Sequence, residues 1–262
     1  MTANKMIYKL ETIEGAEKFA KKELLEKFAD SKIIASKKAL IEFENEKDID
    51  EFRTLLASLR ITNEQGITRN HTTPRLRTIN LFRREWRKEF VPAGLNPALA
   101  YVMCMIAELE SKDEILDPFC GGGTIPITAK LYFDVKKVIA ADISGKAVEI
   151  TRKNFETAEI NKKDYFILQK GIKHLKLKVG SVDKIITNLP FGIRAGVHSQ
   201  NELTYKFFAE QAKRYLKSDG MLVILTQEKL LLRETFKDFR LIEEIAVNAG
   251  GLRPSIFKYK LK

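Results

Sequence analysis

Apolar and polar positions in residues 1–68 recur with the periods of short strands and short helices. Met6 to Leu10 predicts a strand, and Glu14 to Ala29 carries apolar side chains at helical spacing, which predicts a helix. The elements expected after them are strands at Lys32–Ala35 and Ala39–Phe43 and a helix at Lys47–Leu59. The pattern therefore indicates a small α+β domain over residues 1–68.

From Leu95 onward the pattern changes, because apolar runs of strand length alternate with segments of helical periodicity. The expected strands are Glu114–Asp117, Lys137–Ala141, Tyr165–Gln169, Val182–Thr187 and Met221–Thr226, followed by a pair at Phe239–Val247 and Ser255–Leu261. The expected helices are Pro97–Leu109, Thr124–Leu131, Gly145–Ala158, Leu203–Leu216 and Glu228–Phe236. This order predicts an α/β domain over residues 95–262. Its sheet is seven-stranded, mostly parallel and Rossmann-like, and it ends in an antiparallel hairpin.

Residues 69–94, between the two domains, are strongly basic. From Arg69 to Lys88 they hold seven basic side chains against one acid, Glu85, with His71, Phe82 and Trp86 interleaved. Such a segment is either a solvated linker or an arm that contacts nucleic acid. Arginine forks fit phosphate oxygens, and flat side chains stack on bases.

The whole chain carries a net charge of +11, which favours an acidic partner. Nucleic acid is the commonest such partner and an anionic membrane surface the next, while a lysine-rich surface without a partner is the third interpretation. Two cysteines and three histidines show no metal-ligand spacing, so no metal is expected. No signal peptide is recognisable, and no apolar run reaches the ~20 residues of a membrane span. We therefore expect a soluble cytoplasmic protein.

A strand, an acid and a glycine-rich turn follow one another at Ile115–Thr124. Three glycines allow a ligand to approach the backbone closely, at the end of the sheet where α/β proteins bind ligands. Pro126 replaces the third glycine of a dinucleotide fingerprint, and Asp117 would repel a phosphate. A carboxylate at this turn suits a cationic ligand such as S-adenosylmethionine, which carries an ammonium and a sulfonium. The alternative is a tight structural turn with an ordinary acid.

Asp142 closes the next expected strand, 19 residues after Gly123 (142 − 123). An acid at this place accepts hydrogen bonds from ribose hydroxyls in related folds. An acid that caps the following helix is the alternative.

Asn188-Leu189-Pro190-Phe191 follows the fourth apolar strand. The exocyclic amine of guanine or adenine is a poor nucleophile, because its lone pair is conjugated with the ring. The Asn188 amide oxygen and the Leu189 carbonyl can accept its N–H bonds, Pro190 stiffens the loop, and Phe191 offers a stacking face. The alternative is a turn in which Phe191 fills the core.

The motifs at 117–127 and 188–194, together with Asn80–Arg87, Pro92–Ala100 and Gly250–Arg253, resemble the THUMP-associated class I RNA methyltransferases. Within that family the resemblance is closest to the tRNA guanine-N2 methyltransferases, and it covers residues 70–262. It implies a class I methyltransferase fold, S-adenosylmethionine as cofactor and RNA, in particular tRNA, as partner. The first domain resembles the ferredoxin-like domain of this family.

The resemblance also implies roles for individual residues. The expected cofactor-binding residues are Pro92, Gly94, Leu95, Asp117, Phe119, Gly121, Gly123, Thr124, Asp142, Ile143, Gly171 and Asn188. The residues expected to hold the target base and carry the reaction are Asn188, Leu189, Pro190 and Phe191. The expected RNA-binding residues are Arg75, Arg77, Arg83, Arg84, Arg87, Arg194 and Arg253.

Two departures from the family pattern widen the range of functions. Gln169-Lys170-Gly171-Ile172 lacks the acid that binds the adenine amino group in the family, and no segment is long enough to form a THUMP domain. We therefore expect either a protein partner that binds the RNA in place of the THUMP domain or a shorter RNA substrate. An adenine-N6 methyltransferase on RNA or DNA is the first alternative, and a catalytically weak scaffold that binds RNA or cofactor is the second.

Overall fold

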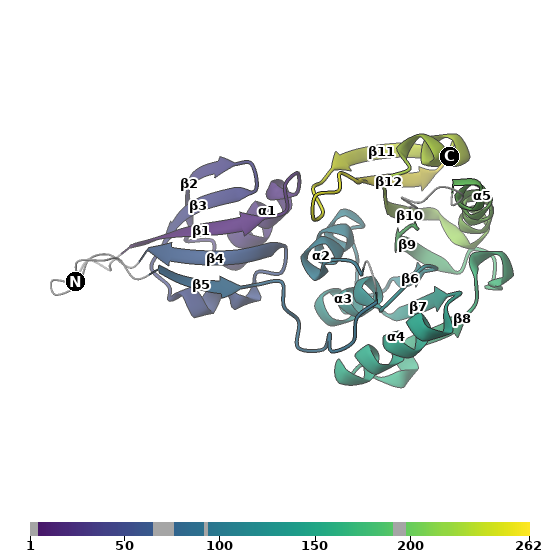
Figure 1. Cartoon of the computed structure of the whole chain (residues 1–262), viewed down its shortest axis with the longest axis horizontal. Helices are drawn as coiled ribbons and strands as arrows, with labels where there is room; N and C mark the ends of the chain where they lie inside the picture. The colour runs from purple at the N-terminus through teal and green to yellow at the C-terminus, as the bar shows by residue number, and fades with distance from the viewer. Residues whose placement is uncertain (1–4, 65–75, 92–93, 191–197) are drawn as a thin grey trace.

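The computed structural model describes residues 5–64, 76–91, 94–190 and 198–262, which form two lobes, each with its own sheet (Figure 1). The N-terminal lobe contains β1 (Met6–Thr12), α1 (Glu17–Lys27), β2 (Lys32–Lys37), β3 (Leu40–Asn45), a 3₁₀ helix η1 (Ile49–Thr54), β4 (Ser58–Glu64) and β5 (Leu76–Asn80). Its antiparallel sheet has the order β2-β3-β1-β4-β5. The first four strands have the ferredoxin-like order, with η1 in place of the second helix.

The helix expected over Lys47–Leu59 is wrong, because the chain turns into strand β4 after one short 3₁₀ helix. Asp48 and Glu51 form a capping box, so the helix start is as the sequence indicates. The buried Glu23 carboxylate then accepts the backbone N–H groups of Leu56 and Ala57 at 2.8–2.9 Å. These bonds hold the backbone in an extended course that helical hydrogen bonding would exclude.

The segment expected as a linker over residues 69–94 contains a strand. β5 pairs with β4 from Leu76 to Asn80, and Ile79 is buried in the N-terminal core. Arg77 also pairs with Asp48 and Asp50. The N-terminal lobe therefore extends to Asn80, and the connection between the lobes is shorter than the sequence indicates.

The C-terminal lobe confirms the expected α/β sheet with its terminal antiparallel hairpin. Its helices are α2 (Pro97–Ile106), α3 (Thr124–Phe133), α4 (Gly145–Thr157), α5 (His198–Tyr215) and α6 (Lys229–Thr235). Its strands are β6 (Glu114–Asp117), β7 (Lys137–Asp142), β8 (Tyr165–Gln169), β9 (Val182–Asn188), β10 (Leu216–Thr226), β11 (Phe239–Ala246) and β12 (Ser255–Leu261), with short 3₁₀ helices at Lys162–Asp164 and Ile172–His174. The order is β11-β12-β10-β9-β6-β7-β8, with the last five strands parallel and the hairpin antiparallel.

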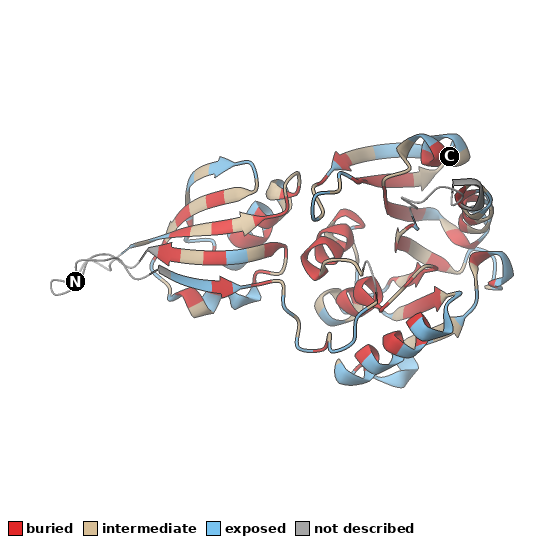
Figure 2. Ribbon diagram, viewed as in Figure 1, coloured by how far each residue is buried: buried red, intermediate tan, exposed pale blue. Residues whose placement is uncertain are grey.

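Most residues of the central strands β6, β7, β9 and β10 are buried (Figure 2). Such strands read as continuous apolar runs rather than alternating ones, because helices cover both faces. Within the described ranges, no helix combines the length and the apolar composition that crossing a bilayer requires.

The two lobes meet where the loop after β1 packs against the end of β11. A side chain at Gly15 would place its Cβ 2.0 Å from the carbonyl oxygen of Ala246, so only glycine fits there. Asn248 donates its backbone N–H to the Glu14 carbonyl at 3.0 Å and its amide Nδ2 to the Glu14 carboxylate at 3.2 Å. These bonds join the N-terminal lobe to the hairpin turn of the C-terminal lobe.

Candidate functional site

Three polar residues that the sequence singles out end three neighbouring strands. Asp117 is the last residue of β6, Asp142 of β7 and Asn188 of β9, and the sheet order places these strands side by side as β9-β6-β7. The strands are parallel, so their carboxyl ends lie at one edge of the sheet. The structure therefore brings the three sequence motifs together at the place where open α/β sheets bind ligands.

Asp117 is buried, with only 1% of its surface exposed. Its Oδ1 accepts hydrogen bonds from the Thr187 hydroxyl at 2.7 Å and from the Phe119 backbone N–H at 3.2 Å. Burial raises the pKa of the Asp117 carboxyl to about 7, and the charge of Asp142 adds to the rise. An isolated buried carboxylate is costly, so a cationic ligand beside it would favour the charged form.

Asp142 holds the glycine turn in place. Its Oδ2 accepts the backbone N–H of Gly121 at 3.0 Å, and its Oδ1 accepts that of Ser144 at 2.9 Å. The N-cap of α4 is Ser144, whose hydroxyl accepts the Ala147 N–H, so Asp142 is not the helix cap.

The glycine turn needs glycine at two positions. Gly121 and Gly123 have φ values of +54° and +80°, which disfavour other residues. The hydroxyl of Thr151 donates to the Gly121 carbonyl at 2.7 Å, and the amide of Asn154 donates to the Gly122 carbonyl at 2.9 Å. Helix α4 thus holds the turn from behind.

Asn154 is a residue that the sequence patterns did not identify. It also bonds the backbone of Glu89 in both directions, at 3.2 Å each, and so ties the segment before Gly94 to the glycine turn. The only signal for it in the sequence is an amide on the buried face of an amphipathic helix, which is too common to be specific.

Two cavities flank Phe119 at this edge of the sheet. The smaller, of about 120 Å³, is lined by Val91, Gly94, Leu95, Asp117, Phe119, Cys120, Gly121, Gly122, Thr124, Ile125 and Asn188. The larger, of about 430 Å³, is lined by Pro118, Phe119, Ile143, Gly171, Ile172, Lys173, His174, Pro190, Leu203, Thr204 and Phe207. Together they take in most of the residues expected around a cofactor, while Gly123 and Asp142 support the turn without lining either cavity.

Asn188 has an unusual environment. Its Oδ1 is buried and has no hydrogen-bond partner among the described residues, although buried polar atoms are nearly always paired. The backbone N–H of Leu189 donates to the Leu225 carbonyl at 3.0 Å, and the carbonyl of Pro190 accepts the Tyr205 hydroxyl at 3.3 Å. This end of β9 therefore holds an amide oxygen that is available to a donor. Phe191, expected next to it, lies outside the described residues, as do Pro92, Arg75 and Arg194.

The basic residues expected to bind RNA differ in whether their side chains already have partners within the protein. The Arg84 guanidinium donates to the carbonyls of Leu81 and Leu56 and lies over the Tyr132 ring. Burial lowers the pKa of Arg84. Both terminal nitrogens donate inside the protein, which argues against the phosphate contact expected from the sequence.

Arg87 and Arg77 are also engaged within the protein. Arg87 is half-buried over the Phe90 ring and lies beside Gly94, and Arg77 pairs with two carboxylates. Arg83 and Arg253 are exposed, and Arg83 lines an open hollow with Arg53 and Lys88. In the ranges that the structure covers, no three side chains of the metal-binding types gather as ligands would.

Known proteins similar to this chain are methyltransferases. A tRNA (guanine(10)-N2)-dimethyltransferase of Methanothermobacter thermautotrophicus is 30% identical over 200 residues, which are 72% of this chain and 58% of that protein. The match takes in between 26% and 58% of the length of these curated relatives.

Solved structures match the fold over the whole chain. TrmN from Thermus thermophilus superposes with a TM-score of 0.85 at 17% identity, covering 98% of this chain and 100% of that one. SMU.472, crystallised with SAH, superposes with a TM-score of 0.81 at 14% identity, with 98% of each chain covered. At these identities the likeness concerns the fold alone.

A family model also matches most of the C-terminal lobe. Residues 84–254 match the RMKL-like methyltransferase domain, from the segment before α2 to the turn before β12. This span contains the three strand ends and the glycine turn. Because it takes in more than half of the chain, the protein belongs to the RMKL-like methyltransferase domain family.

Proposed function

We propose that this protein transfers a methyl group from S-adenosylmethionine to the exocyclic N2 amine of a guanine in tRNA. The observation that carries the proposal is the meeting of Asp117, Asp142 and Asn188 at one edge of the sheet, where the Asn188 amide oxygen has no partner within the described part of the chain. The family supports methyl transfer, and the similar tRNA (guanine(10)-N2)-dimethyltransferase supports the guanine N2 target.

The residues at the glycine turn fit the proposed cofactor. S-adenosylmethionine, when bound, supplies an electrophilic methyl group on a sulfonium. The buried Asp117 beside the smaller cavity suits the positive end of this ligand. Gly121 has no side chain, so the ligand can approach the backbone there. Asp142 is proposed to accept the ribose hydroxyls, with one oxygen still bonded to Gly121.

The larger cavity suits an adenine ring. Its walls are mostly apolar, and Ile143 is 77% exposed there, as expected of a side chain that a flat ligand would cover. The acid that binds the adenine amine in the resembling family is missing, so we propose recognition by shape and by backbone groups near Gly171. If measured binding of S-adenosylmethionine is weak, the alternative of a catalytically weak scaffold is favoured.

The residues after β9 are proposed to handle the target amine. The Asn188 oxygen accepts one amine N–H and the Leu189 carbonyl the other, which turns the nitrogen lone pair toward the methyl donor. Pro190 keeps the loop stiff, and Phe191 stacks on the base. The amine loses its extra proton after the methyl group has arrived, so no strong base is needed.

We further propose that RNA contacts the exposed cations rather than those paired within the protein. Arg83, Lys88 and Arg253 are exposed, and the net charge of +11 would draw the RNA backbone toward them. A protein partner that adds RNA grip stays a prediction, and we expect the protein in the cytoplasm with its tRNA substrate.

One experiment separates the proposal from its alternatives. The protein is incubated with radioactive S-adenosylmethionine and unmodified tRNA transcripts, and the RNA is then digested to nucleosides. Label in N2-methylguanosine supports the proposal, and label in N6-methyladenosine identifies the adenine alternative. If the protein binds the cofactor but transfers no methyl group to tRNA, total RNA or DNA, the alternative of a catalytically weak scaffold is supported.

A further inference from the structure

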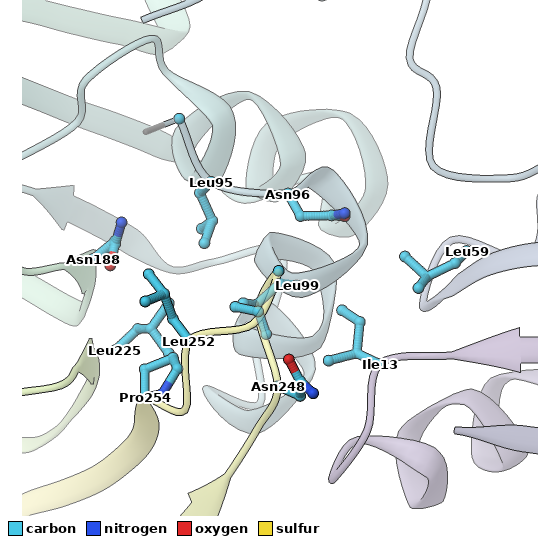
Figure 3. A pocket seen from close by; sticks show the side chains of 13 residues that line it. Ile13, Leu59, Leu95, Asn96, Leu99, Asn188, Leu225, Asn248, Leu252 and Pro254 are labelled. Carbon is cyan, nitrogen blue, oxygen red and sulfur yellow. The ribbon is translucent and has the colours of Figure 1, made fainter. Parts of the chain in front are cut away.

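A third cavity, of about 350 Å³, lies between the two lobes (Figure 3). Ile13 and Leu59 reach it from the N-terminal lobe, and Asn188 and Leu225 line it from the sheet of the other lobe. Its other lining residues come from the start of α2 and from the turn between β11 and β12: Gly94, Leu95, Asn96, Leu99, Asn248, Ala249, Gly250, Leu252 and Pro254. Its volume falls within the ~300–1,000 Å³ of small-molecule sites.

This cavity adjoins the candidate cofactor site. Gly94, Leu95 and Asn188 line both it and the smaller cavity at the glycine turn. A group bound in the inter-lobe cavity therefore lies next to the place proposed for the methyl donor. Asn188 is at the boundary of the two spaces, and its buried Oδ1 has no partner in the ranges that the structure describes.

The walls are apolar and the polar groups are three amides. Both polar atoms of the Asn248 side chain already have partners, because its Oδ1 accepts the Gly251 N–H and its Nδ2 donates to Glu14. Asn96 caps α2 through its Oδ1, which accepts the Ala98 N–H at 2.8 Å. This bond fixes the orientation of the amide, so Asn96 offers a donor to the cavity, and its Nδ2 has no partner among the described residues.

We propose that the inter-lobe cavity holds the flipped target guanine, with its amine at Asn188 and its N7/O6 edge at Asn96. In Figure 3 these two amides lie on different sides of the cavity, with Leu95 between them and Leu252 beside Leu225. Guanine carries its N2 amine on one side and two acceptors, N7 and O6, on its major-groove edge. A buried acceptor on one side and a donor on the other match that pattern, and the leucines offer an apolar wall to one face of the ring.

This inference rests on the proposed function and gives the N-terminal lobe a part in the site. Ile13 and Leu59 close the end of the cavity that the catalytic lobe leaves open (Figure 3). The hydrogen bonds between Glu14 and Asn248 hold that lobe against the hairpin turn carrying Leu252. The lobe is therefore a wall of the base site, in addition to any role in binding the RNA backbone.

The first test fills the cavity from each lobe in turn. Leu252→Trp and Leu59→Trp should each lower methyl transfer to unmodified tRNA transcripts by ~10²-fold or more, comparable to losing a well-placed active-site group. Both should bind S-adenosylmethionine with unchanged affinity in calorimetry, which also shows that each variant is folded. Leu230→Trp is the matched control, because Leu230 is 78% exposed on α6 and lines none of these cavities. It should transfer methyl groups at the wild-type rate.

The second test removes the donor at Asn96 and keeps its cap. Aspartate caps helices as well as asparagine does, so Asn96→Asp should leave the melting temperature nearly unchanged. It should raise KM for tRNA and lower kcat/KM by ~10- to 100-fold, because an acceptor then faces guanine N7 and O6. Asn161→Asp is the control, since Asn161 caps a short 3₁₀ helix through the Lys163 N–H, away from the cavity.

The outcomes distinguish this inference from the proposed function. If the wild-type protein methylates guanine and both tryptophan variants do so at its rate, the cavity is not the base site. If either tryptophan variant instead weakens S-adenosylmethionine binding, the space belongs to the cofactor and the inference is overturned. If the wild-type protein binds the cofactor but labels no RNA, the proposed function fails and the inference fails with it.

Discussion

The hydroxyl of Thr187 donates a 2.7 Å hydrogen bond to Oδ1 of Asp117, and both residues are buried at the ends of neighbouring strands β9 and β6. The bond stabilises the ionised carboxyl, yet it does not offset the cost of burial, because the pKa of Asp117 still rises to about 7. A carboxyl in this state responds strongly to pH and to a nearby cation.

The stability of the ligand-free protein should therefore carry a signature of Asp117. The folded state keeps this proton up to about pH 7, whereas the unfolded chain releases it near pH 4, so stability falls as pH rises through that window. The contribution is at most about 1.4 kcal/mol per pH unit. Melting temperatures of wild type and Asp117→Asn between pH 4 and 8 measure it. The melting temperature of Asp117→Asn should increase relative to that of the wild type as pH rises. Parallel curves of melting temperature against pH would contradict the assignment.

Cofactor affinity should depend on Asp142. Asp142→Ala should weaken S-adenosylmethionine binding by ~1.5–3 kcal/mol, the range for hydrogen bonds to a charged group. Calorimetry measures the change, and Glu149→Ala is a control because that side chain is exposed on α4. Unchanged affinity in Asp142→Ala would refute the ribose assignment. Asp142→Asn, which keeps an acceptor for Gly121, separates loss of the ligand bond from collapse of the turn.

Two adjacent arginines should behave in opposite ways. Arg83→Ala should weaken tRNA binding and reduce the slope of log affinity against log salt by about 1, because an exposed cation releases one counterion. Arg84→Ala should leave that slope unchanged but lower the melting temperature. It leaves the carbonyls of Leu56 and Leu81 without their hydrogen-bond donor, which costs ~1–3 kcal/mol of stability each. Filter binding at several salt concentrations and thermal melts check both. An unaltered slope in Arg83→Ala would make this segment a linker only.

The meeting of three polar residues at one edge of the sheet could be predicted because the signals are local. Each of Asp117, Asp142 and Asn188 ends an apolar strand, and parallel strands bring their ends together. The sequence failed where distant residues decide the outcome. Glu23 redirects the chain after η1, and the pairing of β5 with β4 converts a basic linker into an edge strand.

The difference between Arg83 and Arg84 shows the same limit. Both belong to one basic run, and only tertiary packing brings the second to the Leu56 carbonyl and over the Tyr132 ring. The inter-lobe cavity depends on Ile13 and Leu59, which are remote in sequence from Asn188 and look like ordinary core residues. No periodicity in the sequence could have joined them.

Phe191 separates a stacking role from a core role. Stacking holds the flipped base before and during reaction, so Phe191→Ala should weaken productive tRNA binding and rate, while Phe191→Tyr keeps much of both. A core phenylalanine would instead cost ~3–5 kcal/mol of stability when cut to alanine. Steady-state kinetics with thermal melts decide between them. An alanine variant that melts early yet methylates normally at low temperature would rule out stacking.

Asn188→Ala should abolish turnover without harming the fold. Its Oδ1 is buried without a partner among the described residues, so removing it relieves an unsatisfied acceptor, and the melting temperature should stay level or rise. The oxygen is proposed to act on the amine as the methyl group arrives, and losing such a group typically lowers kcat by ~10²–10³. Cofactor affinity should remain close to wild type. If Asn188→Ala gains stability and loses turnover, the role of Asn188 is functional. If the variant loses both stability and turnover, Asn188 serves the structure of β9 instead.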